Sequence, residues 1–296
     1  MTFSSDKRES YTMLISVIVT TYNWPEALAA CLDSLLKQDD LHFEILIAED
    51  GELPANAEIA ARYTRNTQIP IRHVRHEDTG FRAGTIRNKA VAVSRGDYLI
   101  FLDGDCLVFP NFVTRHRQLA MQGHFVPGNR VLLSQAFTPT VLKEHLPVYL
   151  WNGLKLLTLR LSGKLNRLLP LFYLPLGFLR RRQPLKWEKA MTCNLAVWRC
   201  DFYQANGFDE LYEGWGYEDS DLVIRLIHNG VHRLEGRFGV PVLHLWHKQN
   251  PRDKADANYQ RLLQRVNNPQ CLRAEKGVME HLPKAAHTTT PTGAAH

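Results

Sequence analysis

The sequence predicts an α/β protein whose mostly parallel, Rossmann-like sheet is flanked by helices. Short, nearly continuous apolar runs rich in Val and Ile recur in the first hundred residues, as is typical of strands covered on both faces. Amphipathic helical patterns separate these runs, and such alternation favours a parallel sheet. Polar residues follow three of the runs, where ligands bind beyond the carboxyl ends of parallel strands.

The first strand is predicted over residues 14–20 (LISVIVT), followed by an amphipathic helix. Asn23 is expected to cap this helix, with Glu26 three residues later and Pro25 in the first turn. The other elements predicted in this half are strands over 43–48, 71–74 and 98–102 and a helix over 85–94. The strand ends at 20–23, Asp50 and 103–105 are therefore expected to converge on one site.

Residues 147–187 form an insertion of different composition, rich in Leu, with eight Lys and Arg and no Asp or Glu. A helical stripe is expected on Leu150, Leu154, Leu157, Leu161 and Leu165, and Pro170 and Pro175 break the helix. One interpretation packs the stripe on the domain and leaves the cations in water. The other lays the segment on an anionic membrane surface, because it is too interrupted and too basic to span a bilayer.

The globular pattern resumes after residue 189. We expect a strand and a short helix that ends near Asn206 and Gly207, then a helix with acids in its first turn that stops at Asn229 and Gly230. These elements predict a single domain over residues 1–281. Residues 282–296, rich in Thr, Pro, Ala and His, are expected to form a disordered tail.

Net charge and cysteine content limit the partners. A formal charge of +6 suits nucleic acid, anionic lipid or phosphorylated small molecules, but no RNP, zinc-finger or recognition-helix pattern favours nucleic acid.

The five cysteines are odd in number and form no CxxC pair, which favours reduced thiols over disulfides or a zinc site. The N-terminus has no signal-peptide pattern. We expect a cytoplasmic protein, or a peripheral one on the inner face of the cytoplasmic membrane.

Two carboxylates one residue apart, Asp103 and Asp105, follow the strand predicted over 98–102. They repel each other and are costly to desolvate, so a cation is expected between them. Carboxylate oxygens suit Mg²⁺ or Mn²⁺, which complete their coordination with substrate phosphates and water. His244 and His247 are candidate further ligands. On a strand they would point to opposite faces, but in a turn both could face the site, and the sequence favours His247.

Cations for a diphosphate are offered by the segment GFRAGTIRNKA, which contains Arg82, Arg87 and Lys89. Arginine forks match phosphate oxygens, and glycine permits close backbone approach. Arg82 is the favoured candidate, whereas Lys89 fits a solvated helix charge.

Glu218 and Asp219 follow Trp215, which two glycines flank. An exposed aromatic ring suits the C–H face of a sugar. The helix N-terminus favours ionised carboxylates, one of which could accept a hydroxyl proton as a general base. The alternative is plain helix capping by the acids, Asp221 included.

Together these stretches resemble the family 2 glycosyltransferases, which have the GT-A fold. The resemblance covers roughly residues 14–247 and rests, in order, on ISVIVTTYN, AEDG, GFRAGTIRNKAVAVSRGDYLIFLDGDC, CNLAVWR and GFDELYEGWGYEDSDLVIRL. The last block is similar to the C-terminal motif of β-1,4-galactosyltransferases and chondroitin-type polymerases. The sequence departs from many relatives at AEDG, where Glu52 replaces the serine of VDDGS.

The resemblance implies a role for each matched residue. It assigns the donor nucleotide to Thr20, Tyr22, Asp50, Arg82, Asp103 and Gly104, with Asp50 on the uracil and Arg82 on the diphosphate. It assigns Mn²⁺ or Mg²⁺ to Asp103, Asp105 and the histidines His247 or His244. It makes Asp219 the base, and it places the sugar and acceptor against Trp215, Gly216 and Glu218.

The implied activity is inverting, metal-dependent transfer of a hexose or N-acetylhexosamine from a UDP-sugar to a hydroxyl. The acceptor would be a glycan or lipid-linked precursor of lipopolysaccharide, capsule or another surface polysaccharide. One alternative is a sugar-nucleotide nucleotidyltransferase, although TTYNWPE after the first strand lacks the glycines of a phosphate loop. The other is a non-catalytic glycan-binding protein on the same fold.

Overall fold

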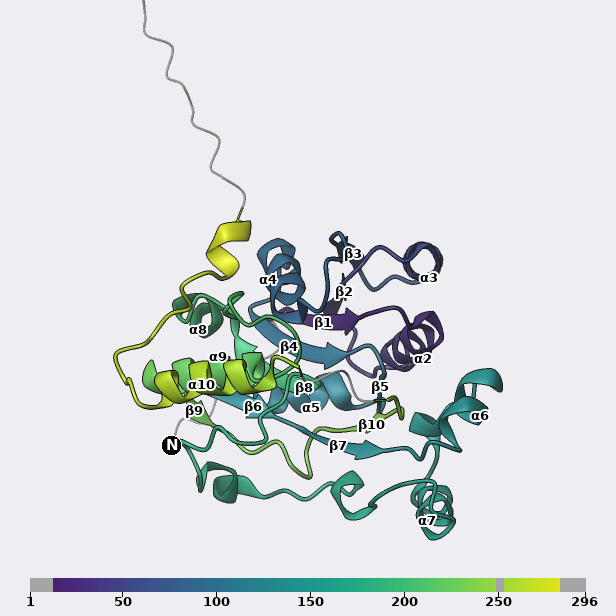
Figure 1. The fold of residues 1–296 in the computed structure, drawn as a ribbon. Helices are drawn as coiled ribbons and strands as arrows, with labels where there is room; N and C mark the ends of the chain where they lie inside the picture. Colours follow the sequence, from purple (N-terminus) through teal and green to yellow (C-terminus); the bar gives the residue numbers. More distant parts are fainter. Residues whose placement is uncertain (1–12, 249–252, 283–296) are drawn as a thin grey trace, which may run out of the picture.

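The computed structural model describes residues 13–248 and 253–282. A large twisted sheet lies between two layers of helices, and a small sheet sits at one end of it (Figure 1). The large sheet has the strand order β3-β2-β1-β4-β8-β6-β9, and the small sheet the order β5-β10-β7. These sheets confirm the predicted α/β class.

The strands of the large sheet are β1 (Ile15–Thr21), β2 (Phe43–Glu49), β3 (Ile71–Arg75), β4 (Tyr98–Asp103), β6 (His124–Pro127), β8 (Asn194–Trp198) and β9 (His232–Arg233). Those of the small sheet are β5 (Cys106–Val108), β7 (Asn129–Leu132) and β10 (Pro241–His244). Of the described strands in the large sheet, β8 alone runs antiparallel to its neighbours, so the sheet is mostly parallel as predicted.

The α-helices are α2 (Pro25–Leu35), α3 (Pro54–Arg65), α4 (Ala83–Val93), α5 (Phe112–Leu119), α6 (Thr138–Lys143), α7 (Gly153–Leu161), α8 (Arg199–Gln204), α9 (Glu218–His228) and α10 (Ala255–Val266). Short 3-10 helices are η1 (Val148–Leu150), η2 (Leu169–Leu171), η3 (Gly177–Arg181) and η4 (Val278–His281). The predicted bounds of β1, β2, β3, β4 and α4, and the predicted end of α9, agree with these bounds to within two residues.

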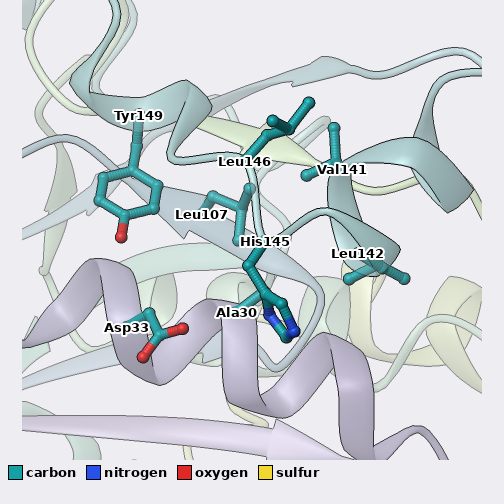
Figure 2. A pocket seen from close by; sticks show the side chains of 8 residues that line it. All are labelled: Ala30, Asp33, Leu107, Val141, Leu142, His145, Leu146 and Tyr149. Carbon is teal, nitrogen blue, oxygen red and sulfur yellow. The ribbon is translucent and has the colours of Figure 1, made fainter.

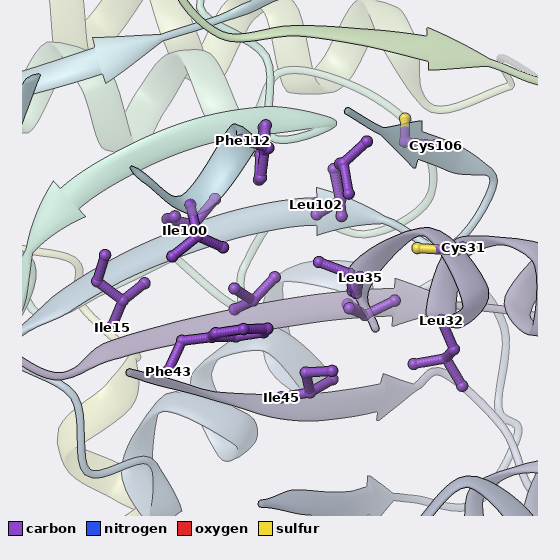
Figure 3. Close-up of a cluster of buried hydrophobic side chains, with 14 of the residues drawn as sticks. Ile15, Cys31, Leu32, Leu35, Phe43, Ile45, Ile100, Leu102, Cys106 and Phe112 are labelled. Atoms are coloured by element: carbon purple, nitrogen blue, oxygen red, sulfur yellow. The ribbon is translucent and has the colours of Figure 1, made fainter. Parts of the chain in front are cut away.

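The core follows from the alternation of side chains along each central strand. Ile15 and Val17 of β1 join the cluster on the face covered by α2, whereas Ile18 joins the cluster on the face covered by α4 and α9. Figure 3 shows the α2 side, where Leu32 and Leu35 lie over the strands. Each fully buried aliphatic side chain contributes about 1.5–3 kcal/mol. The two-sided core explains why the strands have nearly continuous apolar sequences.

Two local predictions were wrong. The N-cap of α2 is Trp24, one residue after the predicted cap, and its side chain makes no capping hydrogen bond. Asn23 instead takes the left-handed conformation with φ 45° and turns the chain out of β1. The long leucine helix is only α7, which ends at Leu161, and Leu165 is buried in a bridge to Leu133.

Three further expectations concern the cysteines, membrane-spanning helices and the C-terminal tail. All five cysteines are unpaired in the described chain, and Cys31, Cys106 and Cys193 are buried. None of the helices within residues 13–248 and 253–282 has the length and apolar character needed to cross a bilayer. Apart from Leu282, the predicted tail lies outside the described residues.

Candidate active site

The site forms where β1 and β4 end side by side. Thr20 pairs in register with Asp103, and the backbone N–H of Gly104 donates to the carbonyl of Thr20 at 2.7 Å. A Cβ at position 104 would lie 3.0 Å from that oxygen, so glycine lets the turn lie close against β1. Asp103 and Asp105 stand on either side of this turn, as the sequence predicts.

Asp105 meets two histidines from β10 and the residues after it. The Nε2 atoms of His244 and His247 each lie 3.4 Å from a carboxylate oxygen of Asp105, and the ligand atoms of all three residues fit within 4.8 Å. The strand ends at His244, so the next three residues turn and bring His247 to the same side. Both histidines face the site, although the sequence favoured His247 over His244.

Backbone contacts set the tautomer of both imidazoles. The Nδ1 atom of His244 lies 2.7 Å from the carbonyl of Leu245, and that of His247 lies 2.8 Å from the carbonyl of Lys248. Because a carbonyl can only accept, each Nδ1 donates to it, and in the neutral form of each imidazole the lone pair is then on Nε2, the atom nearest Asp105. This is the tautomer that a metal ligand needs.

The chemistry of these donors fits a divalent cation. Burial raises the pKa of Asp105, the nearby His244 opposes that rise, and Asp103 adds to it. A cation would compensate the cost of keeping the carboxylate ionised. Two imidazoles with one carboxylate suit Mn²⁺ better than Mg²⁺, which prefers oxygen ligands. Asp103, predicted as a further ligand, lies outside this three-residue cluster and pairs with an arginine.

Arg87 joins three parts of the site through one buried guanidinium. Its Nε donates to Thr20 Oγ1 at 2.9 Å, its Nη2 to Asp103 Oδ1 at 3.1 Å, and its Nη1 to Glu218 Oε1 at 3.3 Å. The ends of β1 and β4 and the start of α9 are therefore joined by hydrogen bonds from one planar guanidinium group. Sequence reasoning favoured Arg82 over Arg87. The missed signal is that Arg87 lies next to Ile86 on the buried face of α4, where a charge needs partners.

Arg82 and Asp50 fix the loop before α4. The backbone N–H of Arg82 donates to Asp50 Oδ2 at 2.7 Å, and its guanidinium donates to the carbonyl of Glu77. The other oxygen of Asp50 lies 2.6 Å from His76 Nε2. Asp50 is thus buried and engaged on both oxygens, and its contact with uracil stays a prediction. His76 has no sequence signal beyond its position after β3.

Tyr22 lies on the exposed side of this loop. Its hydroxyl donates to Asp78 Oδ2 at 3.2 Å, and its ring carbons lie 3.8 Å from where a Cβ at Gly51 would be. The backbone N–H of Asp50 donates to the carbonyl of Thr21 at 2.9 Å. The predicted nucleotide residues Tyr22, Asp50 and Arg82 are therefore neighbours around the ends of β1 and β2.

The loop before α9 has an unusual backbone. Gly214 and Gly216 have φ of 70° and 115°, and Tyr217 has φ of 72°, a conformation that L side chains rarely adopt. The Tyr217 ring packs against Tyr259 of α10 with centroids 5.3 Å apart. This loop starts α9 at Glu218 and carries the half-buried Trp215 beside it.

The pKa of Asp219 is shifted toward neutral pH. Burial and the neighbouring Glu218 raise its pKa to about 7, and the positive charge of Arg87 opposes the rise. Its Oδ1 accepts from the Ser220 N–H at 2.7 Å. A carboxylate that titrates near neutral pH can accept a proton effectively and still be ionised in solution at that pH.

Asp221 has a different role from its neighbours in EDSD. It is fully buried and accepts from Arg225 Nη2 at 2.6 Å and from Arg265 Nε at 3.2 Å. Arg265 also pairs with Asp209 at 2.6 Å. Asp221 therefore anchors α9 to α10 and is not a capping acid, whereas Glu218 is joined to the site through Arg87.

The pocket drawn in Figure 2 is separate from this edge of the sheet. It has a volume of about 20 Å³, lies between α2 and α6, and is lined by Asp33, Leu107, His145 and Tyr149 among others. A space of this size holds about one water molecule. It is too small for a sugar nucleotide.

Comparison with protein families gives two matches. The family described as "Glycosyl transferase family 2" matches residues 16–186, and "N-terminal domain of galactosyltransferase" matches residues 178–248. The boundary of the two matches falls at the end of the basic insertion. The second match contains the GWGYED loop, Asp219 and both histidines.

Curated relatives match over much of this chain. It is 27% identical over 231 residues to validoxylamine A glucosyltransferase of Streptomyces hygroscopicus subsp. jinggangensis, which covers 75% of this chain and 53% of that protein. It is 22% identical over 236 residues to chondroitin synthase of Escherichia coli, which covers 73% of this chain and 32% of that protein. The chain thus spans about half the length of the first relative and about a third of the second.

Solved structures share the fold at low sequence identity. S. aureus TarS 1-349 in complex with UDP-GlcNAc has a TM-score of 0.60 at 13% identity, over 91% of this chain and 69% of that chain. The mannosyltransferase PcManGT from Pyrobaculum calidifontis, in complex with GDP-Man and Mn²⁺, has a TM-score of 0.51 at 15% identity, over 87% and 71%. These likenesses confirm the predicted GT-A fold.

Proposed function

Because the chain belongs to glycosyl transferase family 2, we propose that it is an inverting, metal-dependent glycosyltransferase that moves a sugar from a UDP-sugar to a hydroxyl. One observation supports this most. Arg87 links Glu218, beside the carboxylate with a pKa near 7, to Asp103 in the turn that leads to the Asp105–His244–His247 cluster. This link supports placing the proposed base and the candidate cation site at the same edge of the sheet.

The donor is proposed to be a hexose or N-acetylhexosamine carried by UDP. The TarS structure holds UDP-GlcNAc on the same fold, which supports a UDP-sugar. The nucleotide would lie between Thr20, Tyr22 and Asp50, where the ends of β1 and β2 meet, and Arg82 would face its diphosphate.

The cation is proposed to be Mn²⁺, with Mg²⁺ as the alternative, held by Asp105, His244 and His247. When bound, it would offset the negative charge that develops on the departing diphosphate. The Nδ1 contacts that leave both Nε2 atoms facing Asp105, and the burial of that carboxylate, support this assignment. Asp103 would stay on Arg87 and reach the ribose.

Proton transfer is assigned to Asp219. The ionised carboxylate takes the proton of the acceptor hydroxyl as that oxygen attacks the anomeric carbon, and the bond to UDP breaks on the opposite face. One displacement inverts the configuration and needs no covalent intermediate. Glu218, held by Arg87 at 3.3 Å, is positioned to accept hydrogen bonds from sugar hydroxyls, and Trp215 offers an apolar ring.

The acceptor is proposed to be a glycan or a lipid-linked glycan precursor of a surface polysaccharide. The family match favours glycosyl transfer over nucleotidyl transfer. The non-catalytic alternative predicts binding of UDP-sugar without turnover.

A donor screen tests the proposal. The purified chain is mixed with Mn²⁺, a panel of UDP-sugars and glycan acceptors, and released UDP and pyrophosphate are both measured. We expect UDP release with one donor, and loss of turnover with retained UDP binding in Asp219→Asn.

The matched control is Asp201→Asn in α8, which follows the end of β8 farthest from the site. It should leave turnover unchanged. Pyrophosphate release from a nucleoside triphosphate, or full turnover by Asp219→Asn, would refute the proposal.

A further inference from the structure

The segment of residues 150–186 carries a concentration of exposed apolar side chains. Eleven of the 19 large apolar residues that are exposed in the described chain lie within it. Its sequence has eight Lys and Arg and no acid from residue 147 to 187. An apolar surface surrounded by charges of a single sign is unusual for a protein that meets only water.

The helix α7 shows how this surface is arranged. Leu156 and Leu159 are each 6% exposed and belong to the hydrophobic cluster beneath the helix. Leu154, Leu157 and Leu161 are 71%, 39% and 78% exposed. At 100° per residue these three lie on the face opposite the buried pair. Leu154, Leu157 and Leu161 of the predicted stripe therefore point away from the domain, whereas Leu165 is buried.

Cations flank this outward leucine face. On the helical wheel, Lys155 and Arg160 fall on the two sides between the outward and the buried leucines, and both are exposed. Lys164 and Arg167 follow the helix and are exposed as well. Long cationic side chains in such positions can reach lipid phosphates while leucines enter the layer below.

A fixed turn continues the pattern beyond α7. Phe178 in η3 is 80% exposed, and the exposed Arg181 lies in the same turn. The buried Arg180 holds this turn, because its guanidinium donates to the carbonyls of Glu235 at 2.6 Å and Arg237 at 2.9 Å. The exposed ring is therefore carried on a supported backbone.

The segment forms one edge of the molecule. In Figure 1 it runs from α7 along the lower side of the view, on the opposite side of the large sheet from α3 and α4. A pocket of about 290 Å³ adjoins it and shares Leu150 and Tyr173 with the exposed set. The Arg115 guanidinium lies 3.7 Å from the centroid of the Tyr173 ring in this pocket. Aromatic rings and cations of this kind are typical of a membrane interface.

We propose that residues 150–186 dock on the surface of an anionic phospholipid bilayer. Leu154, Leu157, Leu161 and Phe178 enter the outer part of the acyl layer, and the flanking cations lie against lipid phosphates. Charge complementarity favours an anionic bilayer over a basic partner, because the segment contains Lys and Arg but no Asp or Glu. Docking does not depend on the transferase activity proposed above, and it would bring a lipid-linked acceptor close to the enzyme.

Vesicle flotation of the full chain tests the proposal. We expect co-flotation with vesicles of phosphatidylglycerol in phosphatidylcholine at about 0.05 M salt, and none with pure phosphatidylcholine. Binding should fall steeply at about 0.5 M salt, where charges are screened within a few ångströms.

Two variants measure separately what the apolar and the cationic side chains contribute to vesicle binding. The triple variant Leu154→Ser, Leu157→Ser, Leu161→Ser should lower the partition coefficient at least about tenfold. The double variant Lys155→Glu, Arg160→Glu should lower it about tenfold or more. All five side chains are exposed, so the fold should persist. Circular dichroism and UDP binding check this.

Matched controls come from the rest of the surface. Leu41→Ser, at a leucine that is 65% exposed, and Arg65→Glu, at an exposed arginine of α3, should leave flotation unchanged. Absence of flotation with anionic vesicles at low salt would overturn the proposal, and so would equal losses in test and control variants. A wild-type dimer that the triple variant converts to a monomer, without vesicle binding, would show that a second copy covers this face instead.

Discussion

Replacing Arg87 by Met should both destabilise the fold and move the pH dependence of catalysis. The substitution removes three hydrogen bonds and leaves the carboxylates of Glu218 and Asp103 without their cation. Removing one partner of a buried ion pair costs about 3–5 kcal/mol. Because the Asp103 side chain is 31% exposed, water recovers part of this cost, and we expect about 3 kcal/mol. The midpoint of thermal unfolding should fall by about 6–12 °C.

The same change acts on Asp219 through charge. Arg87 lowers the pKa of Asp219, so its loss should raise that pKa further above about 7. Turnover needs the ionised carboxylate. The pH–rate profile of the wild type should therefore have a rising limb with its midpoint near pH 7. In Arg87→Met that limb should lie at higher pH.

The assay is initial-rate UDP release from pH 5 to 9, with unfolding followed by calorimetry. Arg87→Lys is the matched control, because it keeps the positive charge but loses the planar fork. It should keep the limb near its wild-type pH while losing part of the stability. A limb that does not move in Arg87→Met, together with an unchanged unfolding midpoint, would refute the assigned role of this arginine.

Three further predictions concern single residues of the site. Asp219→Asn should be more stable than the wild type at pH 8 by about 2–4 kcal/mol, because the folded protein holds a carboxylate whose pKa is raised from 3.8 to about 7. This difference in the free energy of unfolding should shrink as pH falls through 7 and vanish below about 4. Denaturant unfolding of both proteins across that pH range measures it, and a difference that stays constant with pH would contradict the prediction. His247→Ala should weaken Mn²⁺ binding by at least about tenfold in an electron paramagnetic resonance titration, and unchanged affinity would exclude this ligand. Gly104→Ala should cost about 1–3 kcal/mol in chemical unfolding, since its Cβ would lie 3.0 Å from the Thr20 carbonyl, and a neutral effect would show that the turn can move.

The central strands and the place of the site could be predicted because their signals are local. Runs such as residues 98–102 are apolar on both faces, and their register follows from a core on either side. Asp103 and Asp105 come directly after such a run, so topology alone brings them to the edge where β1 ends. The GWGYED loop could be found because glycines and acids mark its backbone and the start of α9.

Contacts between distant residues could not be predicted in the same way. The pairing of β10 with β5 brings His244 opposite Cys106, and the sequence of neither strand indicates that it pairs with the other. Arg87 gains its role from Glu218, which lies 131 residues later. In α7, leucines occur on both faces of the helix, so the sequence does not tell which face is buried.

Calorimetric titration of UDP into the wild-type chain, with Mn²⁺ and with a chelator, tests most directly whether this edge of the sheet is a metal-dependent donor site. We predict one site whose affinity is at least about tenfold higher with Mn²⁺, and loss of that difference in Asp105→Asn. Failure of UDP to bind in the presence of Mn²⁺, or a metal dependence that survives Asp105→Asn, would contradict the assignment.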